Sequence, residues 1–227
     1  MMKVLSFYLL TILSITVSAG YSSVNPTSIA NDVLIVLDDS GSMMPQADRI
    51  AQKLPVMVSN LETGRMNLGI IMSDLGVRGQ DGGIFVGSSI VGSFERVLEG
   101  LNRDIRRLMT GSGTASEMFY EPILETFPQV STQKSFHRKD AILNIYVVTD
   151  EDQDSSKDMN SWDFFNKLTQ YKEIKKVVFN LVYPVGGCRQ SQTPSVTDTE
   201  LYKAVIMTGG QVLDLCDPNL KASATAW

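Results

Sequence analysis

The chain of 227 residues is 43% hydrophobic, has a formal charge of −5 at neutral pH and contains one histidine. This length suits one well-filled domain, and an acidic chain with a pI near 4.9 lacks the basic surface that nucleic-acid binding requires. A single histidine excludes histidine-rich zinc sites and argues against histidine-based catalysis.

The first 19 residues are typical of a secretory signal peptide. Lys3 supplies the positive charge, residues 4–17 are mostly apolar, and Val17-Ser18-Ala19 is a small-residue cleavage site. The apolar stretch is shorter than the roughly 20 residues that span a bilayer, and no other stretch is long enough. We therefore expect an exported protein, in a bacterial periplasm or secreted, with no transmembrane segment in the mature chain. A polar leader at residues 20–30 precedes the domain.

Apolar strands alternate with helices along the rest of the chain. The run "DVLIVLD" is short and rich in β-branched residues, as expected for a strand buried on both faces. The segment after it has apolar residues at helical spacing, at Ile50, Leu54, Met57 and Leu61. Strands are expected at 32–38, 66–74, 82–88, 141–150, 176–184 and 210–216, and helices at 44–61, 94–109, 115–127, 161–174 and 197–207.

This alternation predicts a single α/β domain over residues 31–227, with a doubly wound, mostly parallel six-stranded sheet and helices on both faces. The short glycine-rich turn before the third strand suggests a hairpin, so that strand is expected to be antiparallel. With the strand order 3-2-1-4-5-6, the first and fourth strands are neighbours at the point where the order reverses. Ligands of such sheets bind there, beyond the carboxyl ends of the strands.

Cys188 and Cys216 are the two cysteines of the chain. Each lies at the end of a predicted strand, and an exported protein meets an oxidising compartment. We therefore expect a disulfide between neighbouring strand ends, with two buried free thiols as the alternative.

Oxygen-bearing side chains gather after the first and fourth strands. Asp38, Ser40 and Ser42 alternate as the chain leaves the first strand, and Asp150 ends the fourth. Thr114 adds a hydroxyl from the "GSGT" segment before a helix. Carboxylates, hydroxyls and water form an all-oxygen shell, which suits Mg²⁺, Mn²⁺ or Ca²⁺.

The motifs "VLDDSGSM", "GSGT" and "VVTD", in this order, resemble the von Willebrand factor A-type (VWA) domain with its metal-ion-dependent adhesion site (MIDAS). The resemblance covers about residues 31–217. It implies that Ser40, Ser42 and Thr114 contact the ion, while Asp38 and Asp150 act directly or through water. It also implies a non-enzymatic role in adhesion, in which a protein partner donates an acidic group to the metal.

Two features depart from that family. Many members have a glycine after the last aspartate, whereas Glu151, Asp152 and Asp154 follow Asp150 here; we expect these acids at the rim of the site. The family usually ends in a long helix, whereas only "DPNLKASATAW" follows the last strand. The final helix is therefore expected to be short or missing, which argues against conformational switching.

Other functions remain as alternatives. A secreted metal-dependent hydrolase could use the same oxygens, with Asp39 or Glu151 as its base, and a structural subunit could carry a site that has lost its metal. The serines and aspartates could also be helix caps and turn formers. An aspartic-protease loop starting at Asp39 lacks its second motif, and a triad using His137 lacks the Gly-x-Ser-x-Gly turn.

Overall fold

The structure is a computed structural model that describes residues 30–59, 66–73, 88–89, 118–124, 138–153, 159–185, 188 and 195–217. Several predictions lie outside these residues: the signal peptide and leader, the helix at 94–109, Thr114, His137, Asp154 and the chain after residue 217. Among the described helices, none is both long and apolar enough to cross a bilayer.

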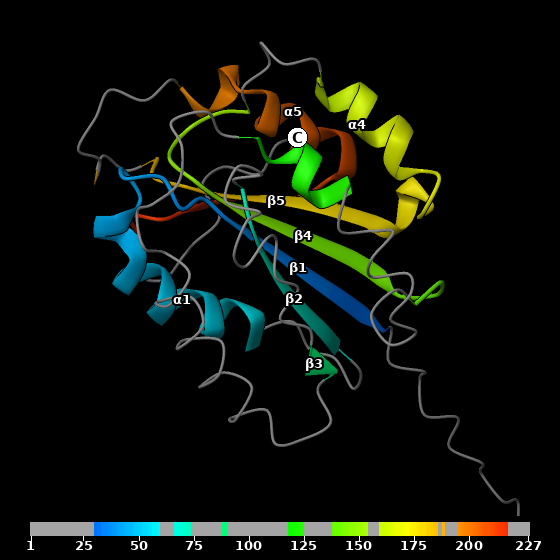
Figure 1. Cartoon of the computed structure of the whole chain (residues 1–227), viewed down its shortest axis with the longest axis horizontal. Coiled ribbons are helices and arrows are strands. Elements are labelled where there is room, and N and C mark those ends of the chain that lie inside the picture. The colour runs from blue at the N-terminus through cyan, green and yellow to red at the C-terminus, as the bar shows by residue number, and fades with distance from the viewer. Residues whose placement is uncertain are drawn as a thin grey trace, which may run out of the picture.

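A sheet of mainly parallel strands forms the centre of the molecule (Figure 1). Its order is β3-β2-β1-β4-β5-β6, and the five strands β2, β1, β4, β5 and β6 are parallel to one another. The predicted α/β fold and strand order are confirmed. The strands are β1 (Asn31–Leu37), β2 (Met66–Met72), β3 (Ser88–Ser89), β4 (Ile142–Val148), β5 (Val177–Tyr183) and β6 (Val212–Asp214).

The third strand was expected at 82–88 and antiparallel. Within the described residues, β3 consists of Ser88 and Ser89, which pair antiparallel with Leu68 and Asn67 of β2. Residues 82–87 lie outside the described part of the chain, and the described sheet is made up mainly of its five parallel strands.

Helices cover both faces of the sheet. In Figure 1, α1 lies on one side, whereas α4 and α5 lie on the other. The helix predicted at 44–61 begins as a 3-10 turn, because Pro45 stands at its start, and continues as the α-helix. The helical elements are η1 (Met44–Gln46), α1 (Ala47–Ser59), α4 (Ser161–Leu168), η3 (Ile174–Lys176), η4 (Val196–Asp198) and α5 (Glu200–Thr208), and residues 120–124 are also helical.

The helix predicted at 161–174 is shorter than expected. Asn160 begins it as the N-cap, accepting a hydrogen bond from the Asp163 backbone N–H at 3.0 Å. Thr169 then donates its hydroxyl to the Asn166 carbonyl at 2.7 Å, so this side chain takes over a backbone acceptor of the last turn. The chain turns there, and α4 ends at Leu168.

Two hydrophobic clusters, one on each face, make up the core. Alternate side chains of β1 enter them: Val33, Ile35 and Leu37 face α1, whereas Leu34 and Val36 face α4 and α5. Because both faces are buried, the strand is an unbroken apolar run. The rings of Tyr120 and Phe164 stack in the cluster under α4 and α5, with their centroids 4.4 Å apart. Aromatic side chains fill this cluster: Phe119, Tyr120, Phe164, Phe165, Phe179 and Tyr183.

Cys188 and Cys216 form a disulfide with a Cα–Cα distance of 5.4 Å. Cys188 follows β5 and Cys216 follows β6, and these strands are parallel neighbours. The predicted bridge between neighbouring strand ends is therefore confirmed.

A buried ion pair holds the amino-terminal end of β1. Asp32 is 2% exposed, and its Oδ1 accepts hydrogen bonds from Arg138 Nε at 2.9 Å and Nη2 at 2.6 Å. Lys172 Nζ donates to the Arg138 carbonyl at 2.7 Å. Burial raises the pKa of Asp32 above its ordinary value, while the hydrogen bonds and charge of Arg138 lower it. The aspartate therefore depends on Arg138 to remain ionised.

We expect Arg138→Ala to lower the free energy of unfolding by about 3 kcal/mol at neutral pH, because it leaves a buried carboxylate unpaired. The loss should shrink as the pH falls through the raised pKa of Asp32 in the folded variant, since the protonated carboxyl needs no cation. Urea denaturation at several pH values measures this. Lys175→Ala, at an exposed ion pair with Glu173, is the control and should have no measurable effect. An equally small effect of Arg138→Ala would contradict the assignment.

Candidate metal site

The candidate site lies where β1 and β4 end side by side. Leu37 is the register partner of Val148, and the Asp38 N–H donates to the Val148 carbonyl at 3.0 Å. The two loops after these strands therefore start next to each other, although they are more than a hundred residues apart in sequence. This is the neighbour relation that the predicted strand order required.

Three of the predicted side chains form a continuous row of oxygens. Ser40 Oγ lies 2.9 Å from Ser42 Oγ, and Ser42 Oγ donates to Asp150 Oδ1 at 2.9 Å. Ser40 is buried, whereas Gly41 beside it is exposed, so the row lies just below the surface. We call Ser40, Ser42 and Asp150 the oxygen row. Thr114, the remaining predicted hydroxyl, lies outside the described residues.

Asp38 supports this row from below. It is fully buried, its Oδ1 accepts the Ser40 N–H at 2.8 Å, and its Oδ2 accepts the Thr149 hydroxyl at 2.6 Å. Burial raises the pKa of Asp38, the hydrogen bonds from Thr149 and Ser40 lower it, and the charge of Asp150 raises it further. Asp38 thus has a protein donor on each carboxylate oxygen and holds the serine loop in place.

The loop of residues 149–153 connects the candidate site to the helical segment at 120–124. Thr149 Oγ1 also accepts the Glu151 N–H at 2.9 Å, which folds the start of the loop. Gln153 Oε1 accepts the backbone N–H groups of Phe119 and Tyr120 at 2.7 and 3.1 Å. These two residues begin the helical segment at 120–124, so Gln153 satisfies the free donors at its start.

Asp152 has a different role from the one predicted. It was expected at the rim of the site, but its carboxylate accepts the N–H groups of Glu200 and Leu201, at 3.0 and 3.2 Å. These are the first residues of α5, whose free donors and dipole favour a carboxylate. Burial raises the pKa of Asp152, and these backbone hydrogen bonds lower it. The helix-cap interpretation therefore holds for this aspartate.

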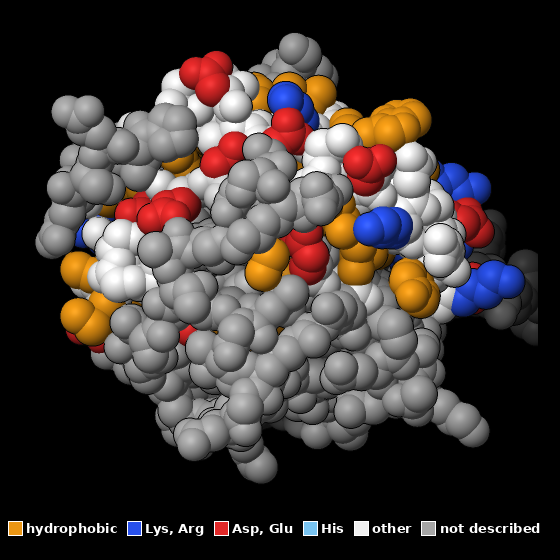
Figure 2. All heavy atoms as spheres, turned by 45° about the horizontal axis from the view of Figure 1, so that its top comes forward, with side chains coloured by type: hydrophobic (Ala, Val, Ile, Leu, Met, Phe, Trp, Pro, Cys, Tyr) orange, Lys and Arg blue, Asp and Glu red, His pale blue; other side chains and the backbone are white. Residues whose placement is uncertain are grey.

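Acidic charge concentrates at this end of the sheet. Glu151 is half-buried, and its pKa is raised by burial and then by the charges of Asp38 and Asp150. In Figure 2 the basic side chains lie mostly to the right, whereas acidic side chains extend across to the left, the side toward which the parallel strands run in Figure 1. The site is therefore a place where a cation would relieve repulsion between carboxylates.

The donor chemistry fits a hard divalent cation, because Mg²⁺, Mn²⁺ and Ca²⁺ all take carboxylate, hydroxyl and water oxygens. Both separations in the oxygen row are 2.9 Å, the ordinary length of a hydroxyl hydrogen bond. The described residues contain no group of three or more His, Cys, Asp or Glu side chains able to hold a metal. A site here would thus depend on the serine hydroxyls.

Sequence reasoning did not identify Thr149, Asp152 or Gln153 as organisers of the site. Thr149 stood inside the quoted "VVTD" motif, and its place beside Asp150 at a strand end was the available signal. The roles of Asp152 and Gln153 depend on contacts with residues 33 to 49 positions away, which no local pattern marks.

No protein-family model matches the chain, and no curated protein matches it either. Among solved structures, the fold is similar to that of proximal thread matrix protein 1 from the mussel byssus. The TM-score is 0.49 at 10% sequence identity, over 80% of this chain and 48% of the mussel protein. The chain thus matches about half the length of that protein, and a likeness at this level is no basis for assigning a function.

We expect Thr149→Val to destabilise the protein by about 1.5–3 kcal/mol, because it removes a buried hydrogen bond to the Asp38 carboxylate without changing the side-chain volume much. Urea denaturation measures the loss. Thr149→Ser keeps the hydroxyl and is the matched control, which should retain most of the stability. A Thr149→Val protein as stable as the wild type, or a Thr149→Ser protein less stable than Thr149→Val, would refute the role of the hydroxyl.

Proposed function

We propose that this protein is an exported VWA-type domain that binds one divalent cation, preferably Mg²⁺, and through it a protein partner. The observation that carries the proposal is the oxygen row, in which two serine hydroxyls and a carboxylate lie at successive spacings of 2.9 Å. Hydroxyl and carboxylate oxygens are the ligands that hard divalent ions such as Mg²⁺ take. The α/β fold and the position beyond the carboxyl ends of β1 and β4 agree with it.

The proposal assigns distinct tasks to the five predicted residues. Ser40, Ser42 and Asp150 would hold the cation, and Thr114 joins them on the strength of the resemblance to MIDAS-bearing domains. Asp38 would act through its hold on the serine loop, because both of its carboxylate oxygens already accept hydrogen bonds from the protein. Mn²⁺ and Ca²⁺ are the competing ions.

A bound cation supplies a positive charge to which an acidic side chain of a partner can bind. Without it, the acids Asp38, Asp150 and Glu151 would repel such a partner. With it, a carboxylate can enter the shell beside the exposed Gly41. We therefore propose metal-dependent binding of an acidic segment of a protein.

The proposed role is non-enzymatic, and the disulfide supports export, since structural disulfides persist in oxidising compartments. The alternative, a secreted metal-dependent hydrolase, uses the same oxygens with Asp39 or Glu151 as its base. Turnover of ester, peptide or phosphoester substrates with Mg²⁺ present, abolished by Glu151→Gln, would favour that alternative.

Calorimetric titration with MgCl₂ should show one site, with weaker binding of CaCl₂. Ser42→Ala should weaken Mg²⁺ binding by roughly 10-fold or more, because it removes the central oxygen of the row. Ser195→Ala, an exposed serine paired with Thr197, is the control and should bind as the wild type does. Mg²⁺ binding that persists unchanged in Ser42→Ala would refute the site, and no binding by the wild type would favour a subunit that has lost its metal.

Affinity capture from the native envelope or culture fluid should retain a protein partner in the presence of Mg²⁺ and release it with EDTA. The Ser42→Ala protein, tested in parallel, should retain none, because the cation bridges the two proteins. A partner retained equally with EDTA, or by Ser42→Ala, would show that the interaction uses another surface.

A further inference from the structure

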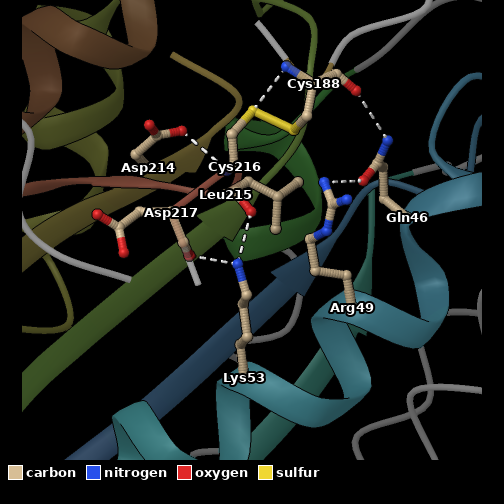
Figure 3. Close-up of a disulfide and its surroundings, with 8 residues drawn as sticks. All are labelled: Gln46, Arg49, Lys53, Cys188, Asp214, Leu215, Cys216 and Asp217. Carbon is tan, nitrogen blue, oxygen red and sulfur yellow. Dashed lines mark hydrogen bonds between the residues drawn. A yellow bond between two sulfur atoms is a disulfide. The ribbon is translucent and has the colours of Figure 1, made fainter. Parts of the chain in front are cut away.

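The first turns of η1 and α1 contact a segment that the disulfide holds (Figure 3). Gln46, the last residue of η1, donates its Nε2 to the Cys188 carbonyl at 3.4 Å. Arg49 Nη1 in turn donates to Gln46 Oε1 at 2.9 Å, which orients the amide of Gln46 toward Cys188. The helical segment that follows Ser40 and Ser42 in the sequence therefore begins in contact with Cys188, one of the two disulfide cysteines.

Lys53 ties the same helix to the other half. It lies two turns further along α1, and its Nζ donates to the Leu215 carbonyl at 2.9 Å and also to the Asp217 carbonyl. These two residues flank Cys216, whose own N–H donates to Asp214 Oδ1 at 2.8 Å. Figure 3 shows the Gln46 side chain of η1 and the Lys53 side chain of α1 reaching toward the two ends of the bridge.

The two disulfide cysteines also contact each other through a backbone N–H group. Cys188 N–H lies 3.0 Å from Cys216 Sγ, so the backbone of one half also contacts the sulfur of the other. The contacts of Gln46 and Lys53 thus meet the two segments that the disulfide joins after β5 and β6. We call Gln46, Lys53, Cys188 and Cys216 the clamp. Both cysteines are partly exposed, so the sulfurs can be approached by a thiol.

A short, ordered path leads from the clamp to the oxygen row. The Gln46 N–H donates to the Met43 carbonyl at 2.8 Å, and the Met43 N–H donates to the Ser40 carbonyl at 3.2 Å. Met43 is fully buried against the α1 face of the sheet. Three residues therefore separate Gln46 from Ser42, and a displacement of η1 would change the spacing of the serine hydroxyls.

We infer that the clamp positions the oxygen row, so that reduction of the Cys188–Cys216 disulfide by a dithiol weakens cation binding. A thiolate of the reductant attacks one sulfur and forms a mixed disulfide, and its second thiol then closes the reductant's own disulfide. Two electrons and two protons pass to the protein, which gains thiols at Cys188 and Cys216. The segment that carries Cys188 is then released from Cys216, and Gln46 loses its fixed acceptor.

The fold does not depend on the bridge alone. Leu213 and Leu215 remain packed in the cluster under α1, and β6 stays paired with β5. Reduction should therefore loosen the clamp and the serine loop while the sheet persists. Because cation binding is itself part of the proposed function, the test also needs a measurement that does not use metal.

Hydrogen exchange of the metal-free protein, followed by mass spectrometry, supplies that measurement. We expect dithiothreitol to speed amide exchange in residues 40–54 by about tenfold while β4 and β5 stay protected. Mg²⁺ affinity by calorimetry should fall by about tenfold in the same reduced sample, as for other residues that support metal ligands. The Cys188→Ser/Cys216→Ser variant should behave like the reduced protein and be insensitive to dithiothreitol.

Variants that retain the disulfide distinguish the effect of the clamp contacts from the effect of losing the cross-link. In the oxidised protein, Gln46→Ala combined with Lys53→Met should raise exchange in residues 40–54 and weaken Mg²⁺ binding, whereas the exposed Gln52→Ala on the same helix should change neither. The comparison of the double variant with Gln52→Ala tests the inference even if the cysteine variant fails to fold. Unchanged exchange in both the reduced protein and the double α1 variant would overturn the inference. An oxidised wild type that binds no Mg²⁺ would refute the proposed function, and the exchange result alone would then decide whether the clamp positions the loop.

Discussion

The parallel pairing of β1 with β4 determines where the oxygens of the candidate site lie. The register of Leu37 with Val148 brings Asp38 beside Thr149, and the hydrogen bond between those side chains joins the two loops directly. Ser42 and Asp150 then meet one step further out. A shift of one residue would reverse the face to which each side chain points, so the buried alternation of β1 protects the geometry of the site.

The loop after β4 supports structure on two sides. Thr149 and Asp150 face the serine loop, whereas Asp152 and Gln153 satisfy the free N–H groups at the starts of two helical segments. Buried donors without partners are costly, so this loop has few alternative positions. The serine loop is held at its other end by η1 and its contact with Cys188. The oxygen row is therefore pre-arranged between two anchored segments.

Buried carboxylates have different partners at the two ends of the sheet. At the amino end, Asp32 is neutralised within the protein by Arg138. At the carboxyl end, burial and the charge of Asp150 raise the pKa of Asp38, and burial and the charges of Asp38 and Asp150 raise the pKa of Glu151. The donors that the structure describes on Asp38 are the neutral Ser40 N–H and Thr149 hydroxyl. Hydroxyl donors stabilise a carboxylate without cancelling its charge. This contrast is the physical reason for placing a cation, and through it an acidic partner, at the carboxyl end.

Local pattern was sufficient for the strands and for the first residues of the site. The apolar runs of β1 and β4 predicted two buried strands, and Asp38, Ser40, Ser42 and Asp150 were found because polar residues directly follow those runs. The early end of α4 and the capping role of Asp152 needed the tertiary structure. So did the contact of Gln46 with Cys188, which joins residues 142 positions apart. Periodicity reports which face of an element is buried, whereas the partner of a polar side chain depends on how separate segments pack in space.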